Sequence, residues 1–475
     1  TNLTGNITTA GDTAYGLLVN DSNSNTTNLT GDISTTGSTA HGLHLTSSDS
    51  NTTNITGDIT TSGANADGFR ENSGSQLNTI NITGDISASG FSADGIITNS
   101  LGYSYITLLG DITVSGTSGH GVKLYSDNSE FTMTGNIATS GQGGDGLDIQ
   151  GDSNTVLLTG DITLLEENAL GPQDAIKIIG DSNNVTITGN TTSNASTGPR
   201  GSYGSGLYIL SGTSNSIVLN GNMTMNGDGP GDAIELDTSN SNTITMTGNI
   251  STVGDTAHGI GLDTSDSNTL NITGDITTTG DGSRGIYSKD SDSNIYTVIG
   301  DISTTGDNAR GIFIKTSDSN TINMTGNITT TGNGSYGMRL NGSDSNNITI
   351  NGNITTSGTD GDSEAIFINN SDSNTITLSG SVQALGGDDQ AIYINAGSDA
   401  NTFGIESGAT FLGDFENLGT NTVITNRGVM DGIENTGSIA TFNNAQTGAT
   451  YSGTLPVNYN IIINSPTDYG STTFS

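Results

Sequence analysis

A glycine followed by Asp or Asn, and usually then by Ile, recurs about every 26 residues along most of this 475-residue chain. The spacing between successive glycines of this kind stays between 25 and 32 residues. The glycines are Gly5, Gly31, Gly57, Gly84, Gly110, Gly135, Gly160, Gly189, Gly221, Gly248, Gly274, Gly300, Gly326, Gly352 and, followed by Ser instead, Gly380. A sustained repeat of this length predicts a solenoid, in which each repeat forms one coil that packs against its neighbours.

Each repeat contains three short runs in which polar and apolar residues alternate. In one repeat these runs are 269–273, 275–277 and 285–287. Alternation with a period of two is typical of β-strands, and here it places Leu270, Ile272, Ile276 and Ile286 inside. We therefore predict an all-β fold, a right-handed parallel β-helix with three short strands per coil, about 26 residues per coil and about 15 coils.

Composition fits a thin solenoid better than a compact globule. Only 30% of residues are hydrophobic, and the chain has no Trp and no Cys, which excludes a disulfide scaffold and thiolate zinc sites. With 48 acidic and 10 basic residues the formal net charge is −38, which repels nucleic acid and anionic membranes and attracts cations. We expect no nucleic-acid partner and no direct membrane insertion, since no apolar run reaches the roughly 18 residues that span a bilayer.

An asparagine six residues before most repeat glycines is a second periodic feature. Asn tolerates the left-handed backbone of tight turns, and its amide can hydrogen-bond to the equivalent amide of the next coil. We predict a structural asparagine ladder that includes Asn242, Asn268, Asn294, Asn320, Asn346 and Asn374.

The repeats resemble those of β-helical passenger domains of bacterial autotransporters and related surface adhesins. The stretch Asn-Thr-Ile-Thr-Met-Thr-Gly-Asn-Ile at residues 242–250 carries this likeness, and regular repeats cover residues 1–402. Residues 403–475 form an irregular C-terminal solenoid or linker region, in which 459–466 is similar to the segment that joins such passengers to a membrane barrel. The resemblance implies a secreted protein on the outer surface of a bacterium, with a further C-terminal domain beyond this chain.

Aspartates in the Ser-Asp-Ser-Asn turns raise the question of calcium, which accepts oxygen-rich sites. The candidate ligands are Asp266, Asp292, Asp318 and Asp344. Asp also satisfies backbone groups in turns, and in another row of the repeat Asn replaces Asp at seven coils, which favours turn chemistry over metal binding. We expect no other cofactor.

The third strand of each coil has the most varied outward positions. All four histidines and eight of the ten basic residues lie on this strand or directly after it. Binding surfaces favour aromatic residues and Arg over Ser and Thr, although solvent-facing positions also vary without any function. The surface-binding candidates are Tyr15, His41, His44, His120, Lys123, Tyr208, Arg284, Tyr287, Arg310, Phe313, Tyr336, Arg339, Phe367 and Tyr393.

Two consecutive coils, after Gly160 and Gly189, are longer than the others. Their extra residues include Glu166, Glu167 and Arg200, and insertions in successive coils map to one edge of a solenoid. Two carboxylates with a nearby base are the minimum for glycoside chemistry, but adjacent acids on a loop are more often solvated. We expect the chain not to be an enzyme.

Three hypotheses follow for the function. The first is a secreted structural and adhesive rod on the cell surface, which presents the third-strand residues to a host or environmental surface, a polysaccharide or other copies of itself. The second is a subunit of an extracellular fibre or coat, a homo-oligomer or filament assembled through open strand edges. The third is a carbohydrate-active β-helix enzyme.

Overall fold

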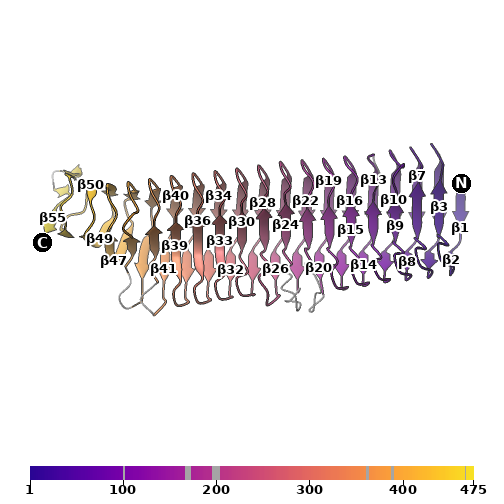
Figure 1. The fold of residues 1–475 in the computed structure, drawn as a ribbon, viewed down its shortest axis with the longest axis horizontal. Coiled ribbons are helices and arrows are strands. Elements are labelled where there is room, and N and C mark those ends of the chain that lie inside the picture. Colours follow the sequence, from indigo (N-terminus) through magenta and orange to yellow (C-terminus); the bar gives the residue numbers. More distant parts are fainter. Residues whose placement is uncertain (100–101, 166–172, 195–203, 360–362, 387–389, 466) are drawn as a thin grey trace. The chain divides into compact units, whose positions relative to one another are not determined.

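A computed structural model describes residues 1–99, 102–165, 173–194, 204–359, 363–386, 390–465 and 467–475. The chain divides into two compact units, Thr1–Gly248 and Asn249–Ser475. Within the described residues every regular element is a strand. Each unit is a parallel β-solenoid, and every full coil of the regular repeats contributes three strands, as the alternation predicts (Figure 1).

The first unit is built from the regular repeats, including the two long coils after Gly160 and Gly189. Its first strands are β1 (Asn2–Thr4), β4 (Thr26–Thr30), β7 (Thr52–Thr56), β10 (Thr79–Thr83), β13 (Tyr105–Leu109), β16 (Glu130–Thr134), β19 (Thr155–Thr159), β22 (Asn184–Thr188), β25 (Ser216–Asn220) and β28 (Thr243–Thr247). Its second strands are β2 (Ile7–Thr9), β5 (Ile33–Thr35), β8 (Ile59–Thr61), β11 (Ile86–Ala88), β14 (Ile112–Val114), β17 (Ile137–Thr139), β20 (Ile162–Leu164), β23 (Thr191–Ser193) and β26 (Met223–Met225). Its third strands are β3 (Leu17–Asn20), β6 (Leu43–Thr46), β9 (Phe69–Glu71), β12 (Ile96–Thr98), β15 (Val122–Leu124), β18 (Leu147–Ile149), β21 (Ile176–Ile178), β24 (Leu207–Leu210) and β27 (Ile234–Asp237).

The second unit continues the regular three-strand coils up to β45 (Ile392–Ile394), and its later strands have different lengths and spacing. Its regular strands are β29 (Ile250–Thr252), β30 (Ile260–Asp263), β31 (Thr269–Thr273), β32 (Ile276–Thr278), β33 (Arg284–Lys289), β34 (Ile295–Ile299), β35 (Ile302–Thr304), β36 (Arg310–Lys315), β37 (Thr321–Thr325), β38 (Ile328–Thr330), β39 (Tyr336–Asn341), β40 (Asn347–Asn351), β41 (Ile354–Thr356), β42 (Ile366–Asn369), β43 (Thr375–Leu378), β44 (Ser381–Ala384) and β45 (Ile392–Ile394). The remaining strands are β46 (Thr402–Ile405), β47 (Thr410–Asn417), β48 (Thr422–Asn426), β49 (Val429–Asn435), β50 (Ile439–Asn444), β51 (Ala449–Gly453), β52 (Asn458–Ile461), β53 (Ile463–Ser465), β54 (Asp468–Tyr469) and β55 (Thr472–Phe474).

Equivalent strands of successive coils pair in parallel and in register. In β31, Leu270 and Ile272 are buried while the final Thr273 is exposed, which is the pattern that alternation predicts. Ile272 pairs with Val298 one coil later, so the inward side chains form continuous apolar columns. These columns are the core of each unit, and they explain how a chain with 30% hydrophobic residues can fold.

The repeat glycines are required by the approach of the backbone of one coil to the next. Gly300 has a φ of 151°, and a Cβ built there would lie 2.1 Å from the carbonyl oxygen of Gly274. A side chain at this corner would therefore collide with the preceding coil, and only glycine fits.

The asparagines predicted to form a ladder hydrogen-bond from coil to coil, mainly through the backbone. The Oδ1 atom of Asn294 accepts the backbone N–H of Asn268 at 2.8 Å, and its Nδ2 donates to the carbonyl oxygen of Ser265 at 2.9 Å. A longer side-chain bond of 3.2 Å joins the Asn268 and Asn294 amides. Each buried asparagine therefore satisfies backbone groups of the preceding coil that would otherwise lack partners.

The coils become shorter towards the end of the second unit. Equivalent asparagines then lie only 18 residues apart, as in Asn417 with Asn435 and Asn426 with Asn444. These shorter coils lack the repeat glycine, so the described chain makes about 17 turns instead of the predicted 15 or so. The right-handed sense of the coil stays a prediction.

Replacing Asn294 by Ala is expected to lower the free energy of unfolding by about 2 to 4 kcal/mol, because a buried amide N–H and a buried carbonyl lose their partners. Asn323 lies on an exposed strand position in the following coil, and its replacement by Ala should change stability by no more than about 0.5 kcal/mol. Urea unfolding combined with native-state hydrogen exchange over residues 265–299 measures both. Equal effects of the two substitutions would contradict a stabilising role of the ladder.

Candidate functional site

We call the outward side chains of the third strands the third-strand face. In each coil it consists of two positions, one directly before a small residue and one three residues later. The first position is held in turn by Tyr15, His41, Asp67, Asp94, His120, Asp145, Asp174, Ser205, Asp232, His258, Arg284, Arg310, Tyr336, Glu364 and Gln390. The second is held by Leu18, His44, Arg70, Ile97, Lys123, Asp148, Lys177, Tyr208, Glu235, Gly261, Tyr287, Phe313, Arg339, Phe367 and Tyr393.

The binding candidates hold outward positions of the strands, yet none of them is exposed. Those that are buried are His41, His44, Phe313 and Tyr336. Those that are half-buried are Tyr15, His120, Lys123, Tyr208, Arg284, Tyr287, Arg310, Arg339, Phe367 and Tyr393. The parallel register places each side chain against its equivalents one coil away, so long side chains in two adjacent rows cover one another.

The small residue between the two positions points into the core. A Cβ built on Gly42 would lie 2.2 Å from Cγ2 of Ile59 and 2.7 Å from the carbonyl oxygen of Gly68. Glycine therefore lets the third strand pack directly on the second strand of the next coil. His41 and His44, on either side of this close approach, lie on the outward face of the same strand.

At the beginning of the face, Tyr15, His41 and His44 form an aromatic cluster. Their ring centroids lie 5.5, 4.5 and 5.0 Å apart. Nδ1 of His41 accepts the backbone N–H of Asp67 at 3.0 Å, which requires a neutral imidazole. Burial, helped by the positive charges of His44 and Arg70, lowers the pKa of His41 to about 3, and burial with Arg70 lowers the pKa of His44 to about 4.

A run of buried carboxylates follows this cluster. Oδ1 of Asp67 accepts the backbone N–H of Asp94, and Nη1 of Arg70 donates to Oδ2 of Asp67 at 2.9 Å. Burial and the neighbouring Asp94 nevertheless raise the pKa of Asp67 to about 7, so desolvation outweighs the ion pair with Arg70.

The acceptor atoms of this row bind the backbone of the next coil. Asp94 accepts the N–H of His120, His120 accepts that of Asp145, and Asp145 accepts that of Asp174, at 2.8 to 3.0 Å. An acceptor near the backbone is therefore the shared property of Asp and His here. Alternation and composition do not reveal this shared role. The spacing of 25 to 29 residues between successive Asp and His residues of the row is a signal that could have shown that these side chains stack from coil to coil.

Arginines and aromatic residues alternate on the part of the face that lies in the second unit. The guanidinium carbon of Arg310 lies 4.9 Å from the ring centroid of Phe313, and that of Arg339 lies 5.2 Å from those of Tyr336 and Phe367. The stacked pairs Tyr287 with Phe313, Tyr336 with Phe367, and Phe367 with Tyr393 have centroid distances of 5.5, 5.3 and 5.5 Å. Arg284 adds a further contact at 4.4 Å from the ring of Tyr287.

The Arg-aromatic strip, residues 284–393 of the third-strand face, contains three arginines and one acidic residue, the buried Glu364. Among the described residues, neither Arg310 nor Arg339 forms an ion pair. The Nε atoms of both are buried and have no hydrogen-bond partner within that part of the chain. Burial and the repulsion of Arg284 and Arg339 lower the pKa of Arg310 to about 10, so the guanidinium remains charged at neutral pH.

The aspartates considered for calcium form a hydrogen-bonded row of their own. Oδ1 of Asp266 accepts the backbone N–H of Asp292, Asp292 accepts that of Asp318, and Asp318 accepts that of Asp344, each at 2.7 Å. Each carboxylate therefore uses one oxygen as a turn acceptor. Of the long coils, Glu166, Glu167 and Arg200 lie outside the described residues.

Comparisons of the chain with family models, with curated proteins and with solved structures gave no match. In the part of the chain that the structure describes, we find no helix with the length and apolar character needed to cross a bilayer.

The variant His41→Asn is expected to become more stable relative to wild type as the pH falls from 6.5 to 4.5. Unfolded His41 binds a proton below its ordinary pKa of 6.5, whereas folded His41 stays neutral down to about pH 3, so acid destabilises the wild type. Asn keeps an acceptor for Asp67 and removes this proton. The difference should reach about 2 to 3 kcal/mol at pH 4.5 by urea unfolding and stay constant above pH 7.5; a pH-independent difference would contradict the neutral imidazole.

Asp292→Asn is expected to leave stability unchanged within about 0.5 kcal/mol, because the amide oxygen can still accept the N–H of Asp318. Asp292→Ala removes the acceptor and should cost about 1 kcal/mol. Thermal unfolding with and without added Ca²⁺ measures both effects. A Ca²⁺-dependent rise in melting temperature that is lost in Asp292→Asn would instead favour the calcium interpretation.

Proposed function

We propose that this chain is an extracellular structural and adhesive protein, whose solenoid coils hold an acidic carbohydrate against the Arg-aromatic strip. The observation that carries the proposal is that Arg310 and Arg339 form no ion pair with any described residue, on a chain with a formal charge of −38. Placing like charges one coil apart is unfavourable unless an anion or solvent compensates them. The strip is thus the part of the described chain best suited to bind an anion.

The geometry of the strip favours a sugar that carries carboxylate or sulfate groups. Guanidinium binds such planar or tetrahedral anions through paired N–H donors, and aromatic rings hold it in a fixed orientation. Arg310 already donates one N–H to the carbonyl oxygen of Asn308 at 2.9 Å, which leaves its other donors for a ligand. The half-buried edges of Tyr287, Phe367 and Tyr393 supply apolar contact and phenolic hydroxyl groups beside these donors.

Charge argues for a carbohydrate over a second copy of the chain. Two copies would each bring a net charge of −38, and repulsion over the remaining coils opposes the attraction of three arginines. A short acidic oligosaccharide brings only the charges that it places on the strip. A fibre or coat subunit is the second candidate, supported by the resemblance of the repeats to surface proteins.

Secretion and a position on the bacterial surface belong to the same proposal. They rest on the resemblance to autotransporter passengers and on a composition rich in Gly, Ser, Thr and Asn without Cys. The proposal contains no catalytic step, because the acids considered for one, Glu166 and Glu167, lie outside the described residues.

Calorimetric titration with oligogalacturonate, a sulfated glycan and a neutral galactan tests the proposal. The acidic sugars should bind and the neutral one should not. Arg310→Gln and Arg339→Gln should each weaken binding about tenfold or more, since a charge-assisted hydrogen bond contributes about 1.5 to 3 kcal/mol. Added salt should weaken binding further.

Arg427→Gln is the matched control, because Arg427 is an exposed arginine of the same unit that pairs with Glu406 at 3.8 Å. It should bind the acidic sugars as the wild type does. Equal losses in all three variants, or equal affinity for the neutral galactan, would overturn the assignment. Sedimentation showing assembly that Arg310→Gln abolishes would favour the fibre subunit instead.

A further inference from the structure

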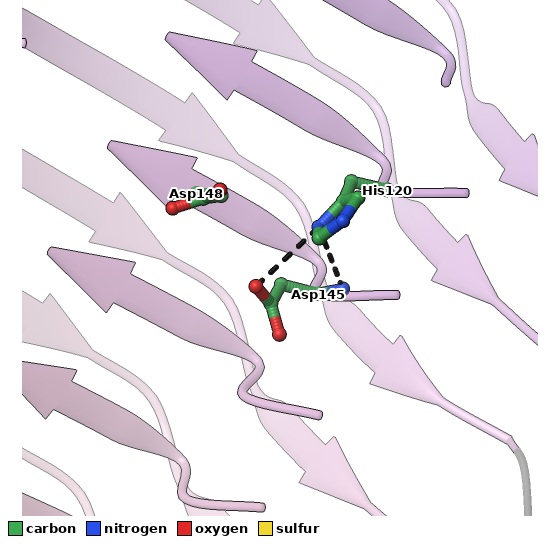
Figure 2. A group of neighbouring side chains, drawn as sticks. All are labelled: His120, Asp145 and Asp148. Carbon is green, nitrogen blue, oxygen red and sulfur yellow. Dashed lines mark hydrogen bonds and ion pairs between the residues drawn. The ribbon is translucent and has the colours of Figure 1, made fainter. Parts of the chain in front are cut away.

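Three side chains of the first unit bring their polar atoms together on the third-strand face. His120, Asp145 and Asp148 each offer one nitrogen or oxygen atom, and these atoms all lie within 4.8 Å of one another (Figure 2). His120 comes from the coil of β15, and the two aspartates come from the next coil, on either side of Gly146, the residue before β18. The aspartates are 3% and 2% exposed, so both carboxylates are almost completely removed from water.

One oxygen in this cluster has no partner. Oδ2 of Asp148 accepts a hydrogen bond from Gln150 at 3.0 Å, but Oδ1 is buried and accepts none within the described chain. Burial and the nearby Asp145 raise the pKa of Asp148. A buried carboxylate oxygen without a donor is costly, and a bound cation would remove that cost.

The same chain shows how a cation is placed in an equivalent arrangement. His41, Asp67 and Arg70 occupy the same three positions as His120, Asp145 and Asp148. The distance from Nδ1 of the histidine to Oδ2 of the first aspartate is 3.3 Å in one cluster and 3.4 Å in the other. In the first cluster the guanidinium of Arg70 lies 2.9 Å from that Oδ2 atom; in the second, the arginine is replaced by another carboxylate.

The neighbouring lysines do not substitute for the arginine. Lys123 pairs with Asp94 of the preceding coil at 3.7 Å. Lys177 lies one coil from Asp148 in register and its charge favours the ionised Asp148, but it forms no ion pair with a described residue. Asp174, in the coil after the cluster, adds a further buried carboxylate. The charge around the cluster is therefore negative in excess.

We propose that His120, Asp145 and Asp148 bind one divalent transition-metal ion of the Zn²⁺ class. A nitrogen ligand with two carboxylate oxygens suits zinc and its neighbours better than calcium, which prefers six or more oxygens. Metal bonds of about 2.1 Å in a tetrahedral arrangement separate two ligand atoms by about 3.4 Å. The Nδ1–Oδ2 distance of 3.4 Å between His120 and Asp145 matches that edge.

Two details of the site shape its expected behaviour. Nδ1 of His120 accepts the backbone N–H of Asp145 at 3.0 Å, so its lone pair is unprotonated, as metal binding requires, but the ion competes with that N–H. Three protein ligands leave a fourth position for water, because His120 is only half-buried. The inference is independent of carbohydrate binding, which we place in the other unit.

Calorimetric titration of chelator-treated protein with Zn²⁺ tests the site, in high salt and excess Mg²⁺ to suppress diffuse binding to the acidic surface. Wild type should take up one Zn²⁺ at a saturable site. His120→Asn and Asp148→Asn should each lose it; Asn at position 120 keeps an acceptor for the N–H of Asp145, and circular dichroism verifies the fold. Bound Co²⁺ should give a visible absorption band in the wild type that both variants lack.

His41→Asn is the matched control, since it alters the equivalent histidine beside Arg70, and it should bind Zn²⁺ as the wild type does. Failure of the wild type to take up Zn²⁺ at a saturable site would overturn the proposal. So would unchanged uptake in both folded variants, or binding of Ca²⁺ in preference to Zn²⁺ at these residues.

Discussion

The structure depends on hydrogen bonding between the backbones of successive coils in strict register. Each strand supplies N–H and C=O groups to the coils before and after it, so no coil is complete without a neighbour. At the corners the coils approach so closely that a Cβ on Gly300 would lie 2.1 Å from the carbonyl oxygen of Gly274. The glycine period is therefore a consequence of coil stacking, and a longer side chain at these corners would push neighbouring coils apart.

At corners and turns, some backbone N–H groups have no carbonyl acceptor in the adjacent coil. Short polar side chains accept the hydrogen bonds of these N–H groups. Asp58 accepts the N–H of Asp85, Asp281 accepts that of Asp307, and Asn294 accepts that of Asn268. Asp, Asn and Ser are suited to this role because their acceptor lies close to their own backbone. Much of the net charge of −38 thus arises from turn acceptors for which the carboxylate charge is incidental.

The difference between features set within one coil and features set by contacts between coils explains what could be predicted from the sequence. The period, the strands and the inward residues follow from local alternation, and Leu270 and Ile272 are buried as alternation requires. Alternation distinguishes only inward from outward positions, so it does not report that outward side chains cover one another. His41 and Asp67 hold outward positions by alternation, although both are buried. The Arg-aromatic alternation was visible as composition, but its stacking depends on which residues are one coil apart.

In a fold of this kind a binding site is encoded along columns of the repeat, at intervals of about 26 residues, and not in any local motif. Hydrogen bonding to the backbone limits which residue types fit at equivalent positions of successive coils. A side chain that adds a buried charge at such a position needs an opposite charge or a proton nearby. Arg70 compensates Asp67 with a covalently attached cation, whereas Asp148 in the equivalent position adds a second buried carboxylate. A solenoid tolerates such a substitution only where the charge is neutralised by a proton or by an ion from solution. The same comparison of equivalent positions identifies the Arg-aromatic strip, where Arg284 and Arg310 occupy the column that holds Asp67, Asp94, Asp145 and Asp174 in earlier coils.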